Sequence, residues 1–340
     1  MEVVSNFNIA LACASDIAEI MSFIDNHWKK DHILARDELF FRYEHQYNDS
    51  INFVVARNNN HAINAVLGFI PTALNEKVTD VCTVIWKVQK KNTIPGLGIQ
   101  MLQYLKTITR VRTLLSVGIN EKTINIYHFL NMFTGTLTQY VMINPHKKDF
   151  VIAKVPKVRE TKELYNSDGY KLEQIEDVEG ISKFNFNAFN HCIPFKNQAY
   201  FSKRYFQHPI YNYHTYGIFF EKELKGLLVT RIQECNGAEV LRIVDFFGEQ
   251  DHLMHVAKSI NELVYTNNFE YTDFYCYGID RGLMLKAGFM YVNPDSEEVI
   301  IPNYFSPFLQ KNIPIHFFAD TSDTNRLRIC KSDGDQDRPS

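Results

Sequence analysis

Apolar and polar residues follow one another with two different periods along this chain. Alternation with many β-branched residues predicts strands, and apolar residues that recur every three or four positions predict amphipathic helices. In the first half, strands are expected over residues 6–12, 52–57, 62–70, 81–88, 113–119 and 137–143. Helices are expected over residues 15–24, 36–46, 99–109 and 121–132.

The second half of the chain repeats this order of elements with little residue identity. Its strands are expected over residues 170–176, 216–220, 226–233, 240–247, 271–277 and 299–301. Its helices are expected over residues 180–189, 197–206, 252–265 and 283–287. Such an internal repeat indicates two copies of one fold. We therefore expect an α/β protein with mixed α+β sheets and two domains, residues 1–155 and 156–340, joined by a linker at 148–168 that holds the charged run 157–163.

Charge and composition argue against nucleic-acid binding, membrane spans and metal sites. Lys and Arg number 36 and Asp and Glu number 39 among 340 residues, and the net charge of −3 provides no basic field for nucleic acid. No apolar run approaches the roughly 18 residues of a membrane-spanning helix, and the N-terminus lacks the basic segment of a secretory signal. We therefore expect a cytoplasmic protein that binds neither nucleic acid nor a membrane. The cysteines show no CxxC spacing, and His252 and His255 have no further Cys or His nearby, so no metal site is expected.

The most informative local sequence lies between the strand 81–88 and the helix 99–109. Gly96 and Gly98 let the backbone approach a ligand, and the free N–H groups of the next helical turn favour an anion. Lys90 and Lys91 add two mobile positive charges beside that turn. The pattern lacks the third glycine of a Rossmann fingerprint and the Gly-Lys-Ser/Thr of a Walker A loop. From the motif alone, a phosphate site and an ordinary glycine turn with solvated lysines are both open.

In its wider context this loop resembles the acyl-CoA-binding core of the GNAT acyltransferase superfamily. That family commonly has Gln/Arg-x-x-Gly-x-Gly/Ala before its CoA-facing helix, and Gly96 and Gly98 match the two small residues. Thr93 stands where the family has Gln or Arg. The next strand ends near Asn120 and is followed seven residues later by Tyr127, as in the family's next motif.

The resemblance implies two tandem GNAT-like domains, of which the first binds a coenzyme A thioester, either acetyl-CoA or 3-hydroxybutyryl-CoA. It implies that backbone N–H groups near residues 86–88 polarise the thioester carbonyl and that Tyr127 protonates the leaving thiolate. A core position is the equally open interpretation of Tyr127. The residues expected around the coenzyme are Trp86, Lys87, Val88, Lys90, Lys91, Thr93, Pro95, Gly96, Leu97, Gly98, Ile99 and Asn120.

The general base is harder to place, because residues 81–86 carry no carboxylate where the family often has Glu. His27, His32 and His45 lie in the region where this family lines its acceptor site. We take His32 as the candidate base and His27 as a candidate acceptor ligand, although each is more often an ordinary surface or capping histidine.

The second half resembles the same family but departs from it at the anion loop. Glu249 and Asp251 in that loop would repel a pyrophosphate, so only the first half is expected to bind coenzyme A, and the second half is expected to bind the acceptor or to be structural. Tandem copies and a similar C-terminal sequence occur in bacterial nucleotide-sugar N-acyltransferases of lipopolysaccharide and O-antigen biosynthesis. Arg326, Arg328 and Arg338 would then clamp the acceptor's pyrophosphate, and a solvated edge strand with a loose tail is the open alternative.

The resemblance thus implies transfer of an acyl group to the amine of a dTDP- or UDP-linked amino-deoxy sugar, by direct attack in a ternary complex. Two alternatives remain open at this point. One is an aminoacyl or peptidyl transferase of tandem GNAT form, and the other is a non-catalytic CoA-binding module. A homo-oligomer is compatible with all three.

Overall fold

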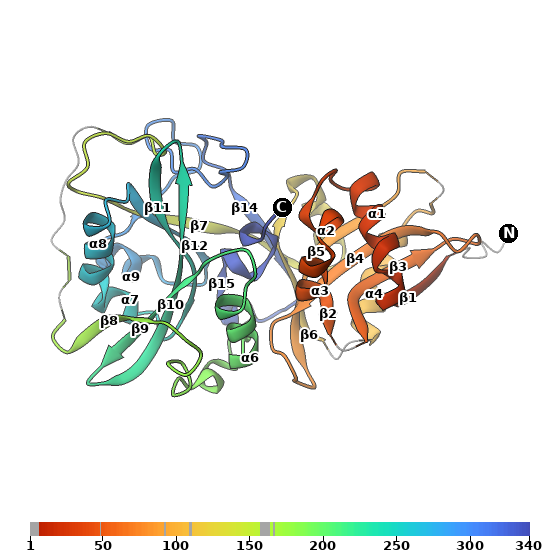
Figure 1. Ribbon diagram of the computed structural model, residues 1–340, viewed down its shortest axis with the longest axis horizontal. Helices are drawn as coiled ribbons and strands as arrows, with labels where there is room; N and C mark the ends of the chain where they lie inside the picture. The colour runs from red at the N-terminus through yellow and green to blue at the C-terminus, as the bar shows by residue number, and fades with distance from the viewer. Residues whose placement is uncertain (1–6, 48, 92, 109–110, 157–163, 166) are drawn as a thin grey trace.

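The computed structural model describes residues 7–47, 49–91, 93–108, 111–156, 164–165 and 167–340, so the run 157–163 lies outside the described residues. Two lobes lie side by side along the long axis of the molecule (Figure 1). The strands of the first half are β1 (Asn8–Cys13), β2 (Gln46–Tyr47), β3 (Ser50–Arg57), β4 (Ile63–Pro71), β5 (Thr79–Val88), β6 (Val111–Ile119) and β7 (Phe133–Ile143). Its α-helices are α1 (Ile17–His27), α2 (Ile33–Arg36), α3 (Glu38–His45), α4 (Leu97–Ile108) and α5 (Ile124–Phe129).

The second half follows the same order of elements, which confirms the predicted internal repeat. Its strands are β8 (Tyr170–Ile175), β9 (His214–Phe220), β10 (Glu223–Cys235), β11 (Ala238–Phe247), β12 (Tyr271–Tyr277), β13 (Met290–Tyr291), β14 (Ile315–Ala319) and β15 (Ile329–Cys330). Its α-helices are α6 (Gln198–Phe201), α7 (His252–His255), α8 (Ala257–Thr266) and α9 (Arg281–Lys286).

The two halves share one continuous mixed sheet, with the strand order β1-β3-β4-β5-β6-β14-β7-β12-β11-β10-β9-β8. The strand β7 belongs to both lobes, because its first residues pair with β14 and its last six residues pair with β12. The exchange is reciprocal: β14 lies between β6 and β7, and β7 lies between β12 and β13. Strands therefore cross the predicted boundary at residue 155 in both directions, and that boundary stays a prediction about folding units.

Helices cover the two faces of the first lobe separately. The apolar side of α1, with Ile20 and Ile24, packs with α2 and α3 against one face of β3 to β5. On the other face, Met101 and Leu105 of α4 pack with α5 against the same strands. The sheet around β5 is thus flanked by α4 and α5 on one face and by α1 to α3 on the other.

Three local predictions were wrong. At residues 299–301 no strand forms, and Ile300 makes only an isolated bridge to Lys154. The other two were wrong in physically interpretable ways. Residues 180–189 form turns and a short 3-10 helix, Phe186–Phe189, instead of one α-helix, because Phe184, Phe186 and Phe189 pack as an aromatic cluster that a regular helix would separate. The predicted helix 252–265 is two helices that break at Val256, whose buried side chain lies in the core of the second lobe. The hydrophobic pattern does not predict β14, which follows Pro314.

Candidate functional site

The strands β5 and β6 are parallel partners only at their start. Their pairing runs from Thr79 to Cys82 of β5, and beyond Cys82 the two strands diverge. At the point of divergence the Ser116 hydroxyl donates a hydrogen bond of 2.8 Å to the carbonyl of Thr83. Past this point, the backbone groups of β5 that would pair with β6 face a gap instead.

A bulge in β5 lies where this gap begins. Leu67 of β4 pairs with Trp86 and Phe69 pairs with Thr83, so two residues of β5 stand opposite Gly68. A bulge leaves one residue out of the hydrogen-bonded ladder and re-aims the strand that carries it. The strand that lines the gap is thus bent, with unpaired backbone groups near Trp86, where polarisation of a carbonyl is predicted.

A cleft of about 500 Å³ opens on the α4 and α5 side of this strand. Its walls come from the end of β5, the glycine loop, the start of α4 and one side of α5. The lining residues are Trp86, Val88, Gly96, Gly98, Ile99, Thr123, Asn125, Ile126 and Phe129. Five of these nine residues are among those predicted from the sequence. Thr123, just before α5, and the three residues on α5 are not.

The α5 residues were missed although they carry a recognisable signal. Phe129 is 78% exposed and Ile126 is 40% exposed, so two large apolar side chains face the cleft without a protein partner covering them. Within the predicted helix, Thr123, Ile126 and Phe129 recur every three residues and so share one side. That spacing, together with the neighbouring loop, points to a ligand-facing stripe.

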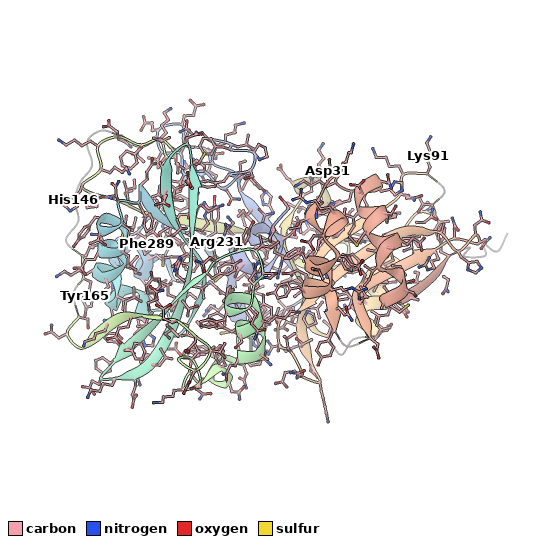
Figure 2. All side chains as sticks on the ribbon, viewed as in Figure 1. Asp31, Lys91, His146, Tyr165, Arg231 and Phe289 are labelled. Carbon is pink, nitrogen blue, oxygen red and sulfur yellow. The ribbon has the colours of Figure 1, made fainter. Side chains whose placement is uncertain are left out.

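The glycine loop has the geometry of an anion site. Gly96 adopts φ of +80°, and a side chain there would meet nothing within 4 Å, so its backbone is open to a ligand. The loop leads into α4, a helix of 12 residues whose first-turn N–H groups carry the positive end of its dipole. Lys90 and Lys91 are exposed beside it, and Figure 2 shows Lys91 projecting from the edge of the lobe.

Two buried polar atoms of this region lack a hydrogen-bond partner among the residues that the structure describes. They are Trp86 Nε1 and Thr93 Oγ1. A side chain at position 98 would come within 2.9 Å of Trp86 Nε1, so glycine is required for the loop to pack on the indole. Unsatisfied donors next to an open cleft are the groups that a polar ligand would satisfy.

Tyr127 lies on α5 beside the cleft, but it is not among the residues that line it. Its ring stacks on Phe318 of β14 at 4.2 Å and contacts Trp86 at 6.1 Å. The side chain is only 4% exposed, and burial raises the pKa of its phenol to about 12, although a hydrogen bond with Thr123 lowers it slightly. Tyr127 is thus both a core residue and a phenol that stays protonated at ordinary pH.

No protein-family model matches the chain, and no curated protein matches it either. Solved structures do resemble it. A GCN5-related N-acetyltransferase from Anabaena variabilis is 11% identical over 92% of this chain and 72% of its own, with a TM-score of 0.56. A conserved protein of unknown function from Enterococcus faecalis, described as a probable N-acyltransferase, is 8% identical over 95% of this chain and 74% of its own, with a TM-score of 0.55.

The fold is that of the GCN5-related N-acetyltransferases. Both similarities extend over both halves of the chain, in agreement with the predicted tandem arrangement.

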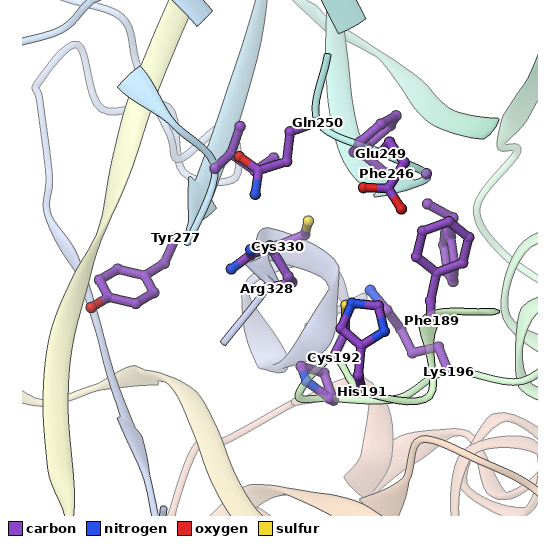
Figure 3. Close-up of a pocket in the computed structure, with 14 residues that line it drawn as sticks. Phe189, His191, Cys192, Lys196, Phe246, Glu249, Gln250, Tyr277, Arg328 and Cys330 are labelled. Carbon is purple, nitrogen blue, oxygen red and sulfur yellow. The ribbon is translucent and has the colours of Figure 1, made fainter. Parts of the chain in front are cut away.

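The second copy of the GCN5-related fold has its strand gap filled by the chain itself. Cys276 and Tyr277 of β12 pair with β15, and because Cys276 also pairs with Thr138 of β7, β15 lies on the edge of β12 that faces β11. A side chain at Gly278 would come within 1.8 Å of the Leu327 carbonyl. The cavity that remains there is lined by Lys196, Glu249, Gln250, Arg328 and Cys330, among others (Figure 3).

His32 and His27, the candidate base and the candidate acceptor ligand, each contact another residue of the protein and lie outside the cleft. His32 is 2% exposed and caps α2, with its Nδ1 accepting the Leu34 N–H at 3.2 Å. Burial, with smaller contributions from Lys29 and Arg36, lowers the pKa of His32 to about 4, so it is a weak base. His27 is exposed, and its Nε2 lies 3.0 Å from the Gln89 side-chain nitrogen. Neither histidine lines the cleft.

The remaining predicted polar residues lie at separate places. Asn120 caps a 3-10 turn before α5, with its side-chain oxygen accepting the Lys122 N–H. Arg326 donates to the His191 carbonyl at 2.5 Å, and Arg328 lines the cavity of the second half. Arg338 is held in an ion pair of 2.5 Å with Glu44 of α3. The three arginines therefore have three different surroundings.

Within the described residues, no helix is long and apolar enough to cross a membrane. The same part of the chain contains no group of His, Cys, Asp or Glu side chains that would hold a metal ion.

Proposed function

We propose that this protein is an acyl-CoA-dependent N-acyltransferase whose coenzyme site is the cleft of the first half. The observation that carries the proposal is the open cleft between a bulged, diverging β5 and α5, at the N-terminus of α4. An acyl-CoA offers a pyrophosphate for that helix terminus and a long, partly apolar arm for Ile126 and Phe129. The fold shared with GCN5-related N-acetyltransferases supports this assignment.

The residues that would bind the coenzyme divide into two groups. The N–H groups of α4 and the exposed Lys90 and Lys91 would contact its phosphates. Trp86, Ile126 and Phe129 would contact its apolar arm, which leads toward the gap between β5 and β6. The unpaired backbone groups of β5 in that gap would polarise the thioester carbonyl.

The reaction we propose is a direct aminolysis. The nitrogen of a neutral amine bonds to the acyl carbon, the C–S bond breaks, and the thiolate receives a proton while the new amide loses one. Tyr127 is the protonated group of the first half that we assign to the thiolate.

For the acceptor, we propose a dTDP- or UDP-linked amino-deoxy sugar, with acetyl-CoA or 3-hydroxybutyryl-CoA as acyl donor. This finer proposal depends on the sequence resemblance to tandem nucleotide-sugar N-acyltransferases. The filled gap of the second half supports a single coenzyme site per chain, because β15 lies where a second coenzyme arm would have to pass.

The test is an assay of the full-length protein with both acyl-CoAs and a panel of dTDP- and UDP-linked amino sugars. We expect free thiol and N-acylated sugar to appear in equal amounts with at least one pair. The corresponding sugars with a hydroxyl in place of the amine are the control and should yield no thiol above background. Absence of thiol release with every amine would contradict the proposal.

A further inference from the structure

The C-terminal segment after β15 lies between the two lobes, and the C-terminus is near the centre of the molecule (Figure 1). It forms two 3-10 turns, Lys331–Asp333 and Asp335–Asp337, and Lys331, Ser332, Asp333 and Asp337 are all at most 2% exposed. The alternative of a loose, solvated tail is therefore wrong for these residues. A tail buried to this extent has a fixed position relative to both lobes.

This segment packs against β6 beside the gap between β5 and β6. A side chain at Gly334 would come within 2.6 Å of Val117 Cβ, and one at Gly118 would come within 2.2 Å of the Gln336 side-chain nitrogen. Both Val117 and Gly118 follow Leu115, the last residue of β6 that pairs with β5. The tail is thus in contact with β6 at the level where the strands have already separated.

The tail reaches this gap from the side opposite to the coenzyme cleft. Arg338 pairs with Glu44 of α3, and α3 packs on the sheet face away from α4 and α5. Val117 and Cys82 belong to the core between the lobes, which is separate from the core under α4. We take this side, where residues 334–336 lie, as the side from which an amine would approach a thioester held in the gap.

The three aspartates of the tail differ in their partners. Asp333 pairs with Lys196 at 2.8 Å, and Asp337 pairs with Arg231 at 2.7 Å. For Asp335, no ion pair or side-chain hydrogen bond of its carboxylate is found among the described residues. Burial raises the pKa of Asp335 to about 6, with Arg338 and Lys29 lowering it and Glu44 raising it. Among the described residues, Lys29, Glu44, Tyr211, Tyr304 and Arg338 interact electrostatically with Asp335.

We infer that Asp335 is the general base of the proposed acyl transfer, supplied to the first lobe by the tail of the second. The inference rests on the proposed function. β5 has no carboxylate between Val81 and Val88, and Glu44 is already neutralised by Arg338. In the step, the Asp335 carboxylate accepts the proton that the acceptor nitrogen loses as its bond to the acyl carbon forms. The C–S bond breaks, and the thiolate takes its proton from the phenol of Tyr127 or from water.

The test is the pH profile of Asp335→Asn, which keeps the size and shape of the side chain. At pH 7 we expect kcat to fall by about 10² or more, with the KM for acyl-CoA changed less than twofold. The wild-type rate should fall with decreasing pH below about 6, as Asp335 takes up a proton. In the variant this limb should disappear, and activity should recover as pH rises and the amine deprotonates unaided. Asp323→Asn, an exposed carboxylate before the tail, is the matched control and should behave as wild type.

The result that overturns the inference is an active wild type with an Asp335→Asn variant of equal rate and unchanged pH profile. A loss of activity that is uniform with pH would also overturn it, because that indicates a structural role. If Asp335→Asn does not fold, Asp335→Glu provides the test. It should keep the low-pH limb, and a folded but inactive Asp335→Glu contradicts the assignment. If the wild type itself transfers no acyl group, the proposed function fails first, and the two failures are therefore distinguishable.

Discussion

At the scale of single residues, Tyr127 of the first lobe contacts two other aromatic rings. Tyr127 lies between Trp86 of β5 and Phe318 of β14, so its position depends on a strand from the other end of the chain. The Asn120–Tyr127 spacing predicts the helix and its tyrosine, but no local pattern predicts Phe318 as the partner. The packing around Tyr127 therefore depends on the exchanged strand β14 as well as on its own helix, α5.

Removing the Tyr127 hydroxyl separates its two roles. In Tyr127→Phe the ring still stacks on Phe318, so we expect the thermal midpoint and the affinity for acyl-CoA to stay close to those of wild type. Loss of the proton donor should lower kcat by about 10². Tyr165→Phe, at a 45% exposed tyrosine, is the control. An unchanged kcat in Tyr127→Phe would leave Tyr127 with its packing role only.

The buried His45 predicts how stability depends on pH. It is 1% exposed against Phe41 and Phe53, and burial lowers its pKa to about 3. The unfolded chain, with an ordinary histidine pKa near 6.5, binds a proton that the folded state does not. The free energy of unfolding should therefore fall by up to about 2 kcal/mol between pH 6.5 and 5.

Denaturant titrations at several pH values, on wild type and His45→Phe, measure this effect. The phenylalanine cannot take up a proton, so the slope between pH 6.5 and 5 should be smaller in the variant. Equal slopes in the two proteins would show that His45 does not contribute to the pH dependence.

At the scale of elements, the glycine loop and α4 form the unit that the sequence predicts best. The spacing of Gly96 and Gly98 is local, and the helix that follows has its own apolar stripe, so both can be read from neighbouring residues. The tail is the opposite case. Its aspartates pair with Lys196 and Arg231, more than 100 residues away, and no periodicity reports such partners.

A charge placed at the loop tests the anion site, and the chain offers a matched control. Gly96 and Gly237 both have positive φ, +80° and +76°, and nothing lies within 4 Å of either. Gly96→Glu and Gly237→Glu should therefore incur similar backbone strain, about 1–2 kcal/mol. Only Gly96→Glu brings a carboxylate to the start of α4.

Calorimetric titration with acetyl-CoA compares the two variants. We expect Gly96→Glu to weaken binding at least tenfold, because the added charge repels the pyrophosphate, and Gly237→Glu to bind as wild type. If both variants bind equally well, the loop is not the phosphate site.

At the scale of the whole molecule, the two lobes are interdependent. β14 completes the sheet of the first lobe, and β7 completes that of the second. The sequence predicts two copies of one fold correctly, but it predicts them as separate units, because a strand exchange leaves no mark on the hydrophobic pattern. The position of β14 between β6 and β7 depends on long-range contacts, such as that of Phe318 with Tyr127.

A fragment of residues 1–155 should therefore not behave as an independent domain. It would lack β14 and leave edges of β6 and β7 unpaired, with Leu115 and Leu137 uncovered. We expect the fragment to aggregate or to unfold without a cooperative transition, as measured by circular dichroism and size-exclusion chromatography. A soluble fragment with a sharp transition near that of the full chain would contradict this expectation and support the boundary near residue 155.

The most direct test of the proposed coenzyme site is a crystal structure of the full chain with coenzyme A. We expect one coenzyme per chain, with its pyrophosphate at the first turn of α4 and its sulfur in the gap between β5 and β6 beside Trp86. Its arm should contact Ile126 and Phe129, and the gap between β11 and β12 should remain filled by β15. Coenzyme A bound in the second half, or no bound coenzyme at millimolar concentration, would contradict a single coenzyme site in the first half.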